Sequence, residues 1–223
     1  MNWMDYLPPL LEGAAITAQL AAYSTVLGAV VAFALGLGRF HRCAWVRGLC
    51  TAVVEFFRGT SLLVQLFWLF FALPLVAEAM GYDWRLSPML AGILALSLNI
   101  GAYGAEVVRG ALQAVRSGQL EAGLSLGLTP PQALWHVRLP QALPEMMPSL
   151  GNLAVQNLKD TALVSLISLA DMAFRAEQIR NLTQDSVTVY TMLLLMYFGM
   201  ALVLAGMMKA LERHVGRWRV KGR

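Results

Sequence analysis

The sequence predicts an all-α membrane protein that crosses the bilayer several times and forms one transmembrane domain over residues 1–223. Of its 223 residues, 58% are hydrophobic and only 13% are charged, and the mean hydropathy is +0.60. Such a chain is too apolar for an ordinary soluble domain. A helix needs about 20 apolar residues to cross the hydrocarbon core. Five stretches are long enough, at roughly 13–38, 49–77, 86–108, 150–170 and 187–208.

The positive charges predict how these five spans are oriented. One side of the membrane receives Arg39, Arg42, Arg47, Arg109, Arg116, Arg138, Lys209, Arg213, Arg217, Arg219, Lys221 and Arg223. The other side receives only Arg85, Arg175 and Arg180. Lys and Arg gather on the cytoplasmic side of membrane proteins. We therefore expect the N-terminus outside, the C-terminus inside, and the long loop of about residues 109–148 in the cytoplasm.

The first expected span, residues 13–38, is rich in Ala, Gly, Ser and Thr, which let membrane helices pack closely. We interpret it as a scaffold helix or as one that faces a second subunit. Cys43 and Cys50 follow it; two isolated cysteines are too few for a metal site, and a cytoplasmic position disfavours a disulfide. The sequence therefore indicates no metal and no cofactor.

The second expected span carries two charged residues and one glutamine. Glu55 and Arg58 are three positions apart, so they can form an ion pair near the cytoplasmic end of a helix. Gln65 lies two turns deeper. It is either a residue that lines a translocation path or the donor of a plain interhelical hydrogen bond.

The third expected span ends in a polar stripe. Asn99, Tyr103 and Glu106 share one helix face, and such a face must contact protein or water. Glu106 and Arg109 again have the spacing of an ion pair. Tyr103 is the better candidate for lining a path.

The loop between the third and fourth spans contains two short helices. The first is expected to start near Ser117 and to end at Gly127, which can adopt the left-handed conformation. Thr129 is a good N-cap for the second, with Gln132 placed for a capping box, and Pro140 is expected to limit it. Two helices around a glycine turn are also typical of DNA-binding proteins. The apolar stretches on both sides place this pair at a membrane surface, which argues against nucleic acid as a partner.

The fourth expected span carries a broad polar face. Charges at that depth cost about 2.5–3.5 kcal/mol each, so Lys159 and Asp160 are functional candidates. For a zwitterionic solute, Asp160 could bind the ammonium or amidine end and Lys159 the carboxylate. Alternatively, one of the two only pairs with a neighbouring helix, and Asp160 is the stronger candidate for the solute. The polar positions fall into two rows: Asn152, Gln156 and Asp160, and beside them Asn157, Thr161 and Ser165.

The two-helix loop resembles the "EAA" loop of the membrane subunits of ATP-binding-cassette (ABC) importers. The residues that carry this likeness are Glu121, Ala122, Gly123, Gly127, Val137, Leu139 and Pro140. Gly123 stands where the family usually has a second alanine, and Val137 where it has isoleucine. The resemblance implies that this pair is a coupling helix unit that docks into a cleft of a separate ATPase subunit.

Three further stretches resemble the polar-amino-acid branch of these importers. Residues 55–65 are similar to its E-x-x-R-G-T-P-x-x-x-Q pattern, with Ser61 in place of the proline. Residues 102–110 match a later motif position by position, and residues 151–165 match another except at Ala162, where the family usually has serine. The resemblance implies a bacterial plasma membrane location, a second permease subunit, ATPase subunits and an external solute-binding protein. Residues 55–61 and 165–171 are more similar to the branch that carries ectoine-type solutes than to the histidine or glutamine branches.

Sequence motifs for other chemistry are absent. The chain has no phosphate-binding Gly-x-x-x-x-Gly-Lys-Ser/Thr loop, no His-Glu-x-x-His and no Gly-x-Ser-x-Gly. We therefore expect a transport subunit and not an enzyme, with ATP hydrolysed on another chain. The alternative is a channel or carrier for small zwitterions that needs no ATPase, which would leave the capped helix pair without a docking function.

Overall fold

The computed structural model describes residues 3–83 and 85–220, and all regular elements in these ranges are helical. This confirms the all-α class. The long helices are α1 (Leu7–Gly38), α2 (Ala44–Gly59), α5 (Pro88–Ala114), α8 (Leu139–Asp160) and α10 (Ser186–Val220). The short ones are α3 (Leu62–Phe67), α4 (Leu73–Ala79), α6 (Ser117–Ser125), α7 (Pro130–Ala133) and α9 (Met172–Thr183). Short segments of 3-10 helix (Trp3–Asp5, Thr161–Ile167) and of π-helix (Trp68–Ala72, Leu134–Arg138) join or extend them.

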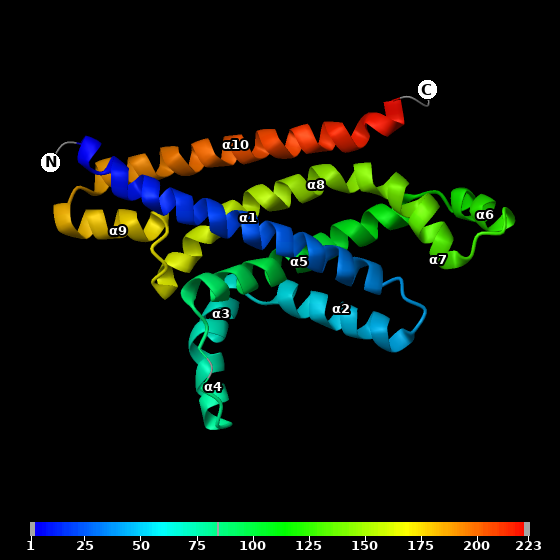
Figure 1. The fold of residues 1–223 in the computed structure, drawn as a ribbon, viewed down its shortest axis with the longest axis horizontal. Coiled ribbons are helices and arrows are strands. Elements are labelled where there is room, and N and C mark those ends of the chain that lie inside the picture. Colours follow the sequence, from blue (N-terminus) through cyan, green and yellow to red (C-terminus); the bar gives the residue numbers. More distant parts are fainter. Residues whose placement is uncertain (1–2, 84, 221–223) are drawn as a thin grey trace.

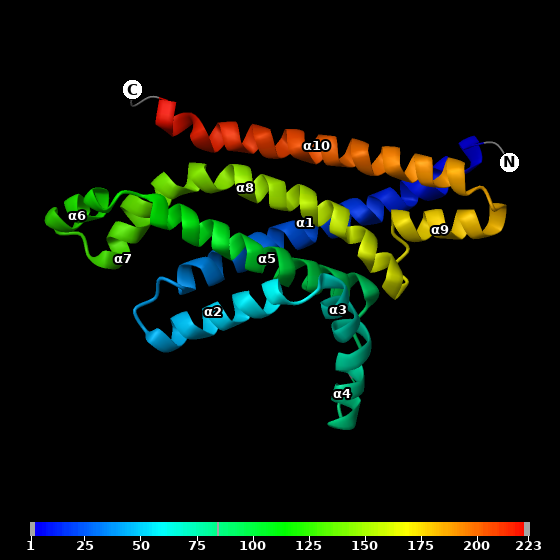
Figure 2. The same ribbon diagram turned by 180° about the vertical axis from the view of Figure 1, so that it is seen from behind.

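The long helices form an elongated bundle. Figure 1 shows α1, α5, α8 and α10 along the long axis, while α3 and α4 form an arm that leaves the bundle at a steep angle. Helix α5 is central, because it packs against α1, α2, α3 and α8. The pair α6–α7, the α1–α2 connection and the C-terminal end of α10 lie at one end, and α9 and the start of α1 lie at the other (Figures 1 and 2). Residues 221–223, the last of the expected basic tail, lie outside the described residues.

Helices α1 and α5 pack closely because small residues line their contact. A Cβ atom on Gly28 would lie 2.4 Å from Cγ2 of Ile100, and one on Gly101 would lie 2.6 Å from Cγ1 of Val31. No side chain fits at either glycine without moving its neighbour. The close packing expected for the first span is therefore made against α5.

The expected spans agree with the helices to different degrees. Among the described residues, four helical segments are long and apolar enough to cross a membrane: Leu7–Gly38, Leu62–Ala79, Pro88–Ala114 and Ser186–Gly216. The first, third and last contain nearly all of the expected spans 13–38, 86–108 and 187–208. The total of five spans and their orientation remain predictions.

The second expected span, 49–77, was wrong as one continuous helix. Helix α2 ends at Gly59, Thr60 and Ser61 are extended with ψ of 153° and 134°, and α3 starts at Leu62. The chain breaks here without the family's proline. The break leaves α2 carbonyls free, and the Gln65 amide binds one of them, the carbonyl oxygen of Phe57, at 2.9 Å.

The fourth expected span, 150–170, also changes character along its length. Its α-helical part belongs to α8, which begins earlier, at Leu139, and packs between α5 and α10. The α-helix ends at Asp160, and a 3-10 turn follows to Ile167. The four-residue spacing therefore stops at Asp160, so Thr161 and Ser165 do not continue the α-helical row of Asn157.

The two-helix loop folds as expected at its turn but not at its end. Helix α6 ends before Gly127, whose φ is +85°, and α7 begins at Pro130 after Thr129. The limit set at Pro140 was wrong. Leu139 keeps helical angles (φ −63°, ψ −45°), and its N–H bonds to the carbonyl of Leu134, five residues back. This π turn carries the helix past the proline and into α8.

Candidate functional site

A hollow of about 260 Å³ with several polar lining residues opens between α5 and α8. It lies close to the middle of α5, because Asn99 is about 17 Å along a helix of roughly 40 Å at 1.5 Å per residue. Its volume is below the roughly 300–1,000 Å³ of sites for drug-sized ligands, so it suits a smaller solute. It is lined by Asn99, Ile100, Tyr103, Leu153, Gln156, Asn157 and Asp160.

Asp160 is the anion of this hollow. Its Oδ1 accepts a hydrogen bond of 2.9 Å from the Gln156 amide one turn earlier on α8. Tyr103 faces the same space from α5, with 40% of its surface exposed. A carboxylate held by a neutral amide keeps its charge free for a cationic group of a solute.

Asn157 reaches the hollow but is mainly bound to α1. Its side chain is only 2% exposed, and its amide donates to the hydroxyl oxygens of Ser24 at 2.7 Å and Thr25 at 3.0 Å. Ser97 on α5 donates to the carbonyl oxygen of Ser24 at 3.2 Å. These bonds join α1, α5 and α8 behind the hollow, and they fix the two walls relative to α1.

Gln65 lies behind the hollow and not in its wall. Its amide donates to Thr60 Oγ1 at 2.7 Å, in addition to its bond to Phe57, and its own oxygen accepts from Asn99 Nδ2 at 3.4 Å. Gln65 is 7% exposed. It joins the α2–α3 break to a residue that does line the hollow.

Three other candidates for the solute path lie outside the hollow. Lys159 is exposed and is not one of the lining residues. Thr161 and Ser165 donate to carbonyl oxygens three residues earlier, at 2.6 Å and 2.7 Å. These bonds fit a local role in the 3-10 turn.

Charged residues cluster one turn beyond Tyr103, toward the α6–α7 end. Both expected pairs are present, Glu55 with Arg58 at 3.5 Å and Glu106 with Arg109 at 2.8 Å. Glu106 also binds Arg58 at 3.5 Å, and it accepts a hydrogen bond from Arg39 at the end of α1. Sequence spacing gave no signal for Arg39, which is 67 residues from its partner. The cluster fastens α1, α2 and α5 to one another.

The expected coupling unit, residues 117–140, is a rigid hairpin. The N–H of Gly127 bonds to the carbonyl of Leu124 at 3.0 Å and that of Leu128 to Gly123 at 3.2 Å, which is the Schellman pattern of a helix end. At the start of α7, the N–H of Thr129 donates to Oε1 of Gln132 at 2.8 Å, as in a capping box. The hydrogen bonds at both ends of its turn leave the hairpin little freedom to bend.

The residues of the EAA pattern occupy both the surface and the inside of this hairpin. Glu121 and Ala122 are exposed on α6, and Pro140 is exposed where α8 starts, while Leu139 is half-buried. Gly123 is buried, and a Cβ there would lie 3.3 Å from Cγ2 of Val137. Gly123 and Val137, the two residues that depart from the family pattern, are therefore in direct contact in the structure.

Arg138 ties the coupling unit to the bundle, and the sequence reasoning missed it. Its Nε donates to the carbonyl oxygen of Leu112 near the end of α5 at 2.6 Å, and its guanidinium lies 5.2 Å from the ring centre of Phe40, just after α1. A displacement of the hairpin would therefore pull on the ends of both α1 and α5. Only its position next to Leu139 and Pro140 could have drawn attention to it.

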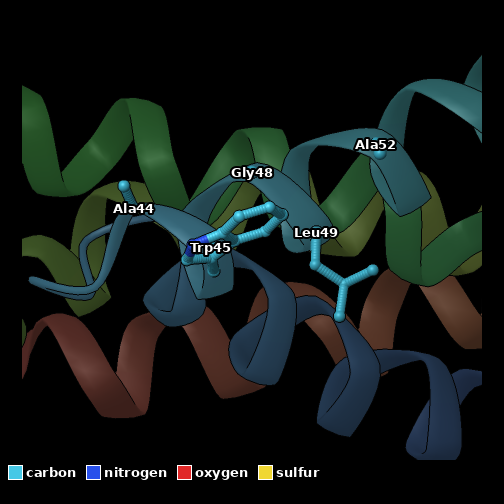
Figure 3. A pocket seen from close by; sticks show the side chains of 5 residues that line it. All are labelled: Ala44, Trp45, Gly48, Leu49 and Ala52. Carbon is cyan, nitrogen blue, oxygen red and sulfur yellow. The ribbon is translucent and has the colours of Figure 1, made fainter.

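A larger hollow of about 450 Å³ lies on the surface of α2 (Figure 3). Trp45 and Leu49, which are 88% and 67% exposed, form most of its wall. The remaining lining residues are Ala44, Gly48 and Ala52. It offers no charged side chain to a zwitterion, so the hollow at Asp160 is the better candidate for a solute.

Comparison with known proteins gives matches along nearly the whole chain. Residues 11–217 match the family described as binding-protein-dependent transport system inner membrane component. The chain is 60% identical to a probable amino-acid ABC transporter permease protein, y4tF, of Sinorhizobium fredii, over 98% of this chain and 92% of that one. It is 32% identical to the glutamine transport system permease protein GlnP of Escherichia coli, over 94% of each chain.

Solved structures give the same result for the fold. A crystal structure of an amino acid ABC transporter with histidines contains a chain that matches with a TM-score of 0.84 and 31% identity, over 95% of this chain and 96% of that one. A chain of the MetNI methionine ABC transporter, at 20% identity, shares the fold with a TM-score of 0.77, over 95% of this chain and 98% of that one. The chain therefore belongs to the family of binding-protein-dependent transport system inner membrane components, the inner-membrane permease subunits of ABC importers.

Proposed function

We propose that this chain passes amino acids through the hollow at Asp160 while a separate ATPase drives it from the coupling unit. The observation that carries the proposal is the connection between the two sites. Arg138 fastens the coupling unit to the end of α5, and the middle of the same helix forms one wall of the hollow. A rigid-body movement of the hairpin can therefore change the position of that wall.

The solute would be held by charge. Its ammonium group, or a cationic side chain, binds the Asp160 carboxylate, and the aromatic ring of Tyr103 covers it from α5. Gln156 keeps the carboxylate oriented through its hydrogen bond. A site near the middle of the membrane can then be opened to either side in turn, as alternating access requires.

The partners follow from the family. We propose ATPase subunits on α6–α7, a second permease subunit beside this one, and an external solute-binding protein that delivers the solute. ATP is hydrolysed on the ATPase chains. The topology proposed is five spans, with α8 and the following 3-10 turn as the polar fourth, the N-terminus outside and the C-terminus inside.

Amino acids are the solute class that the relatives support. The names of these relatives include glutamine and, for two proteins of Bacillus subtilis at 31% and 32% identity, L-cystine and arginine. The ectoine branch gains no support from these relatives. A channel or carrier that works without an ATPase is also disfavoured, because the family consists of importer permeases.

Two substitutions test the proposal. Asp160→Asn keeps the size of the side chain and removes its charge, so amino-acid uptake should fall to background while membrane insertion is unchanged. Lys159→Gln changes a charge at the adjacent, exposed position and should leave uptake near wild type. Equal uptake by the Asp160→Asn variant and the wild type would remove Asp160 from the solute site.

The coupling assignment has its own test. Glu121→Lys reverses a charge on the exposed face of α6 without touching the hollow. It should uncouple transport from ATP hydrolysis and leave solute binding intact. Normal uptake by this variant would contradict the docking of an ATPase at the coupling unit.

A further inference from the structure

The hollow contains an anion for one end of an amino acid but no cation for the other end. None of its seven lining residues is Lys or Arg. Lys159, expected to bind the carboxylate, is outside. We propose that Arg58 is the residue that binds the carboxylate of the solute. This inference rests on the function proposed above and gives Arg58 a role beyond its ion pairs.

Arg58 borders the hollow through Tyr103. The carbon of its guanidinium lies 5.6 Å from the centre of the Tyr103 ring, and the tyrosine hydroxyl donates to the Arg58 carbonyl oxygen at 3.4 Å. Tyr103 itself lines the hollow. Arg58 is therefore in direct contact with a residue of the hollow's wall.

The contacts of Arg58 with its own cluster are weak. Its Nη1 lies 3.5 Å from an oxygen of Glu55 and 3.5 Å from an oxygen of Glu106, beyond the roughly 2.7–2.9 Å of a charge-assisted hydrogen bond. Its Nε is buried and has no hydrogen-bond partner in the described part of the chain. Arg58 thus has donors to spare for a new acceptor.

Glu106 does not depend on Arg58. Arg109 binds it at 2.8 Å and 2.9 Å through two nitrogens, and Arg39 donates to its other oxygen. The glutamate therefore stays neutralised when Arg58 turns toward the hollow. The three arginines consequently differ in function: Arg39 and Arg109 hold the helices, and Arg58 is available to the solute.

The position of Arg58 in the chain gives it room to move. It is the second-last residue of α2, directly before Gly59 and the extended Thr60 and Ser61. A guanidinium presents parallel donors that fit a carboxylate in a bidentate manner. A solute whose amine end is at Asp160 and whose carboxylate is at Arg58 then has both charges paired, with Tyr103 between the two sites.

The test is the preference of the permease for amino acids over analogues that lack the carboxylate. The permease is purified with its bound subunits but without a solute-binding protein and placed in lipid nanodiscs. Equilibrium binding is measured for arginine against agmatine and for histidine against histamine. The ratio of the two dissociation constants in each pair does not depend on the fraction of protein that is active.

The matched variants are Arg58→Gln and Arg109→Gln. Both remove one arginine from the Glu106 cluster, but only Arg58 lies against Tyr103. Loss of a charge-assisted hydrogen bond to a carboxylate should weaken binding by about tenfold or more. We expect wild type and Arg109→Gln to prefer the amino acid by at least about tenfold, and Arg58→Gln to lose that preference. Arg58→Lys should retain part of it.

Each result decides the question. An Arg58→Gln variant that keeps the full preference, or an Arg109→Gln variant that loses it equally, would overturn the role of Arg58 and leave the proposed function standing. Wild-type protein that binds none of the four compounds, or that binds no more tightly than Asp160→Asn, would instead overturn the proposed solute site, and Arg58 with it.

Discussion

Substitution of Glu106 by Gln should destabilise the bundle strongly, because its carboxylate joins Arg39 at the end of α1 to Arg109 on α5 and also lies 3.5 Å from Arg58 on α2. The side chains of Arg39, Glu106 and Arg109 are 12%, 20% and 34% exposed. Breaking a fully buried ion pair costs about 3–5 kcal/mol, and an exposed pair is worth about 0.2–1 kcal/mol. For this degree of burial we expect Glu106→Gln to cost on the order of 2–3 kcal/mol.

Thermal unfolding of the purified chain in detergent measures this cost. At about 2–4 °C per kcal/mol for a chain of this size, the melting temperature should fall by about 4–12 °C. Glu55→Gln is the matched control, since Glu55 is 59% exposed and has a single contact, of 3.5 Å, in the cluster. It should lower the melting temperature by no more than about 4 °C. Equal effects of the two substitutions would show that Glu106 does not fasten the helices.

Three further outcomes are expected. Gly127→Ala places a side chain at φ +85°, so it should lower the free energy of unfolding by about 1–2 kcal/mol and reduce the coupling of transport to ATP hydrolysis. Gly110→Ala, where nothing lies within 4 Å of the added methyl group, should be neutral or stabilising. Equal coupling in the two variants would contradict the role of the turn at Gly127. Gly101→Leu should overpack the contact between α1 and α5 and lower the melting temperature. Gly199→Leu adds the same side chain where nothing lies within 4 Å, so it should leave the melting temperature unchanged. A comparable drop in melting temperature for both variants would argue against the close contact at Gly101. Burial raises the pKa of Asp171, which lies outside the spans, from 3.8 to about 6. The folded state therefore binds the proton of this carboxyl more tightly than the unfolded state does. The stability that this proton binding contributes is complete below about pH 4 and is lost as the pH rises through 6. The melting temperature of wild type relative to Asp171→Asn should therefore fall between pH 4 and pH 7, by the equivalent of about 3 kcal/mol, and a pH-independent difference would be contrary to this assignment.

Local features were the part of this fold that the sequence could predict. The glycine turn at Gly127 and the cap at Thr129 depend on neighbouring residues only, and both are present. The ion pairs of Glu55 with Arg58 and of Glu106 with Arg109 depend on helical spacing and are also present. Each is fixed within one or two helical turns of chain.

Features set by packing were not predictable in this way. Pro140 should end a helix by local rules, but a π turn before it allows the chain to continue into α8. The break at Thr60 and Ser61 contains no proline, and it is compensated by Gln65. In both places another hydrogen bond replaces a backbone hydrogen bond of the regular α-helix: the Leu139 N–H bonds to the Leu134 carbonyl before Pro140, and the Gln65 amide bonds to the Phe57 carbonyl at the α2–α3 break.

The residues that line the hollow could be predicted only in part, and their role in solute transport stays a prediction. Tyr103 and Asp160 come together across α5 and α8, although they are far apart in sequence and only their helix faces pointed to a path. Lys159 was the expected carboxylate ligand because it is adjacent to Asp160, but neighbouring residues project about 100° apart on a helix. Arg58, which lies over the ring of the lining residue Tyr103, comes from α2, and helix periodicity within α8 contains no information about it.

ATP-driven import of amino acids by this chain is tested most directly by uptake into proteoliposomes that contain the purified permease with its ATPase and solute-binding protein. We expect a radiolabelled amino acid to accumulate only when ATP is supplied, and we expect both Glu121→Lys and Asp160→Asn to abolish this accumulation. Uptake that proceeds without ATP and persists in the Glu121→Lys variant would contradict ATP-driven import and identify the chain as a carrier or channel.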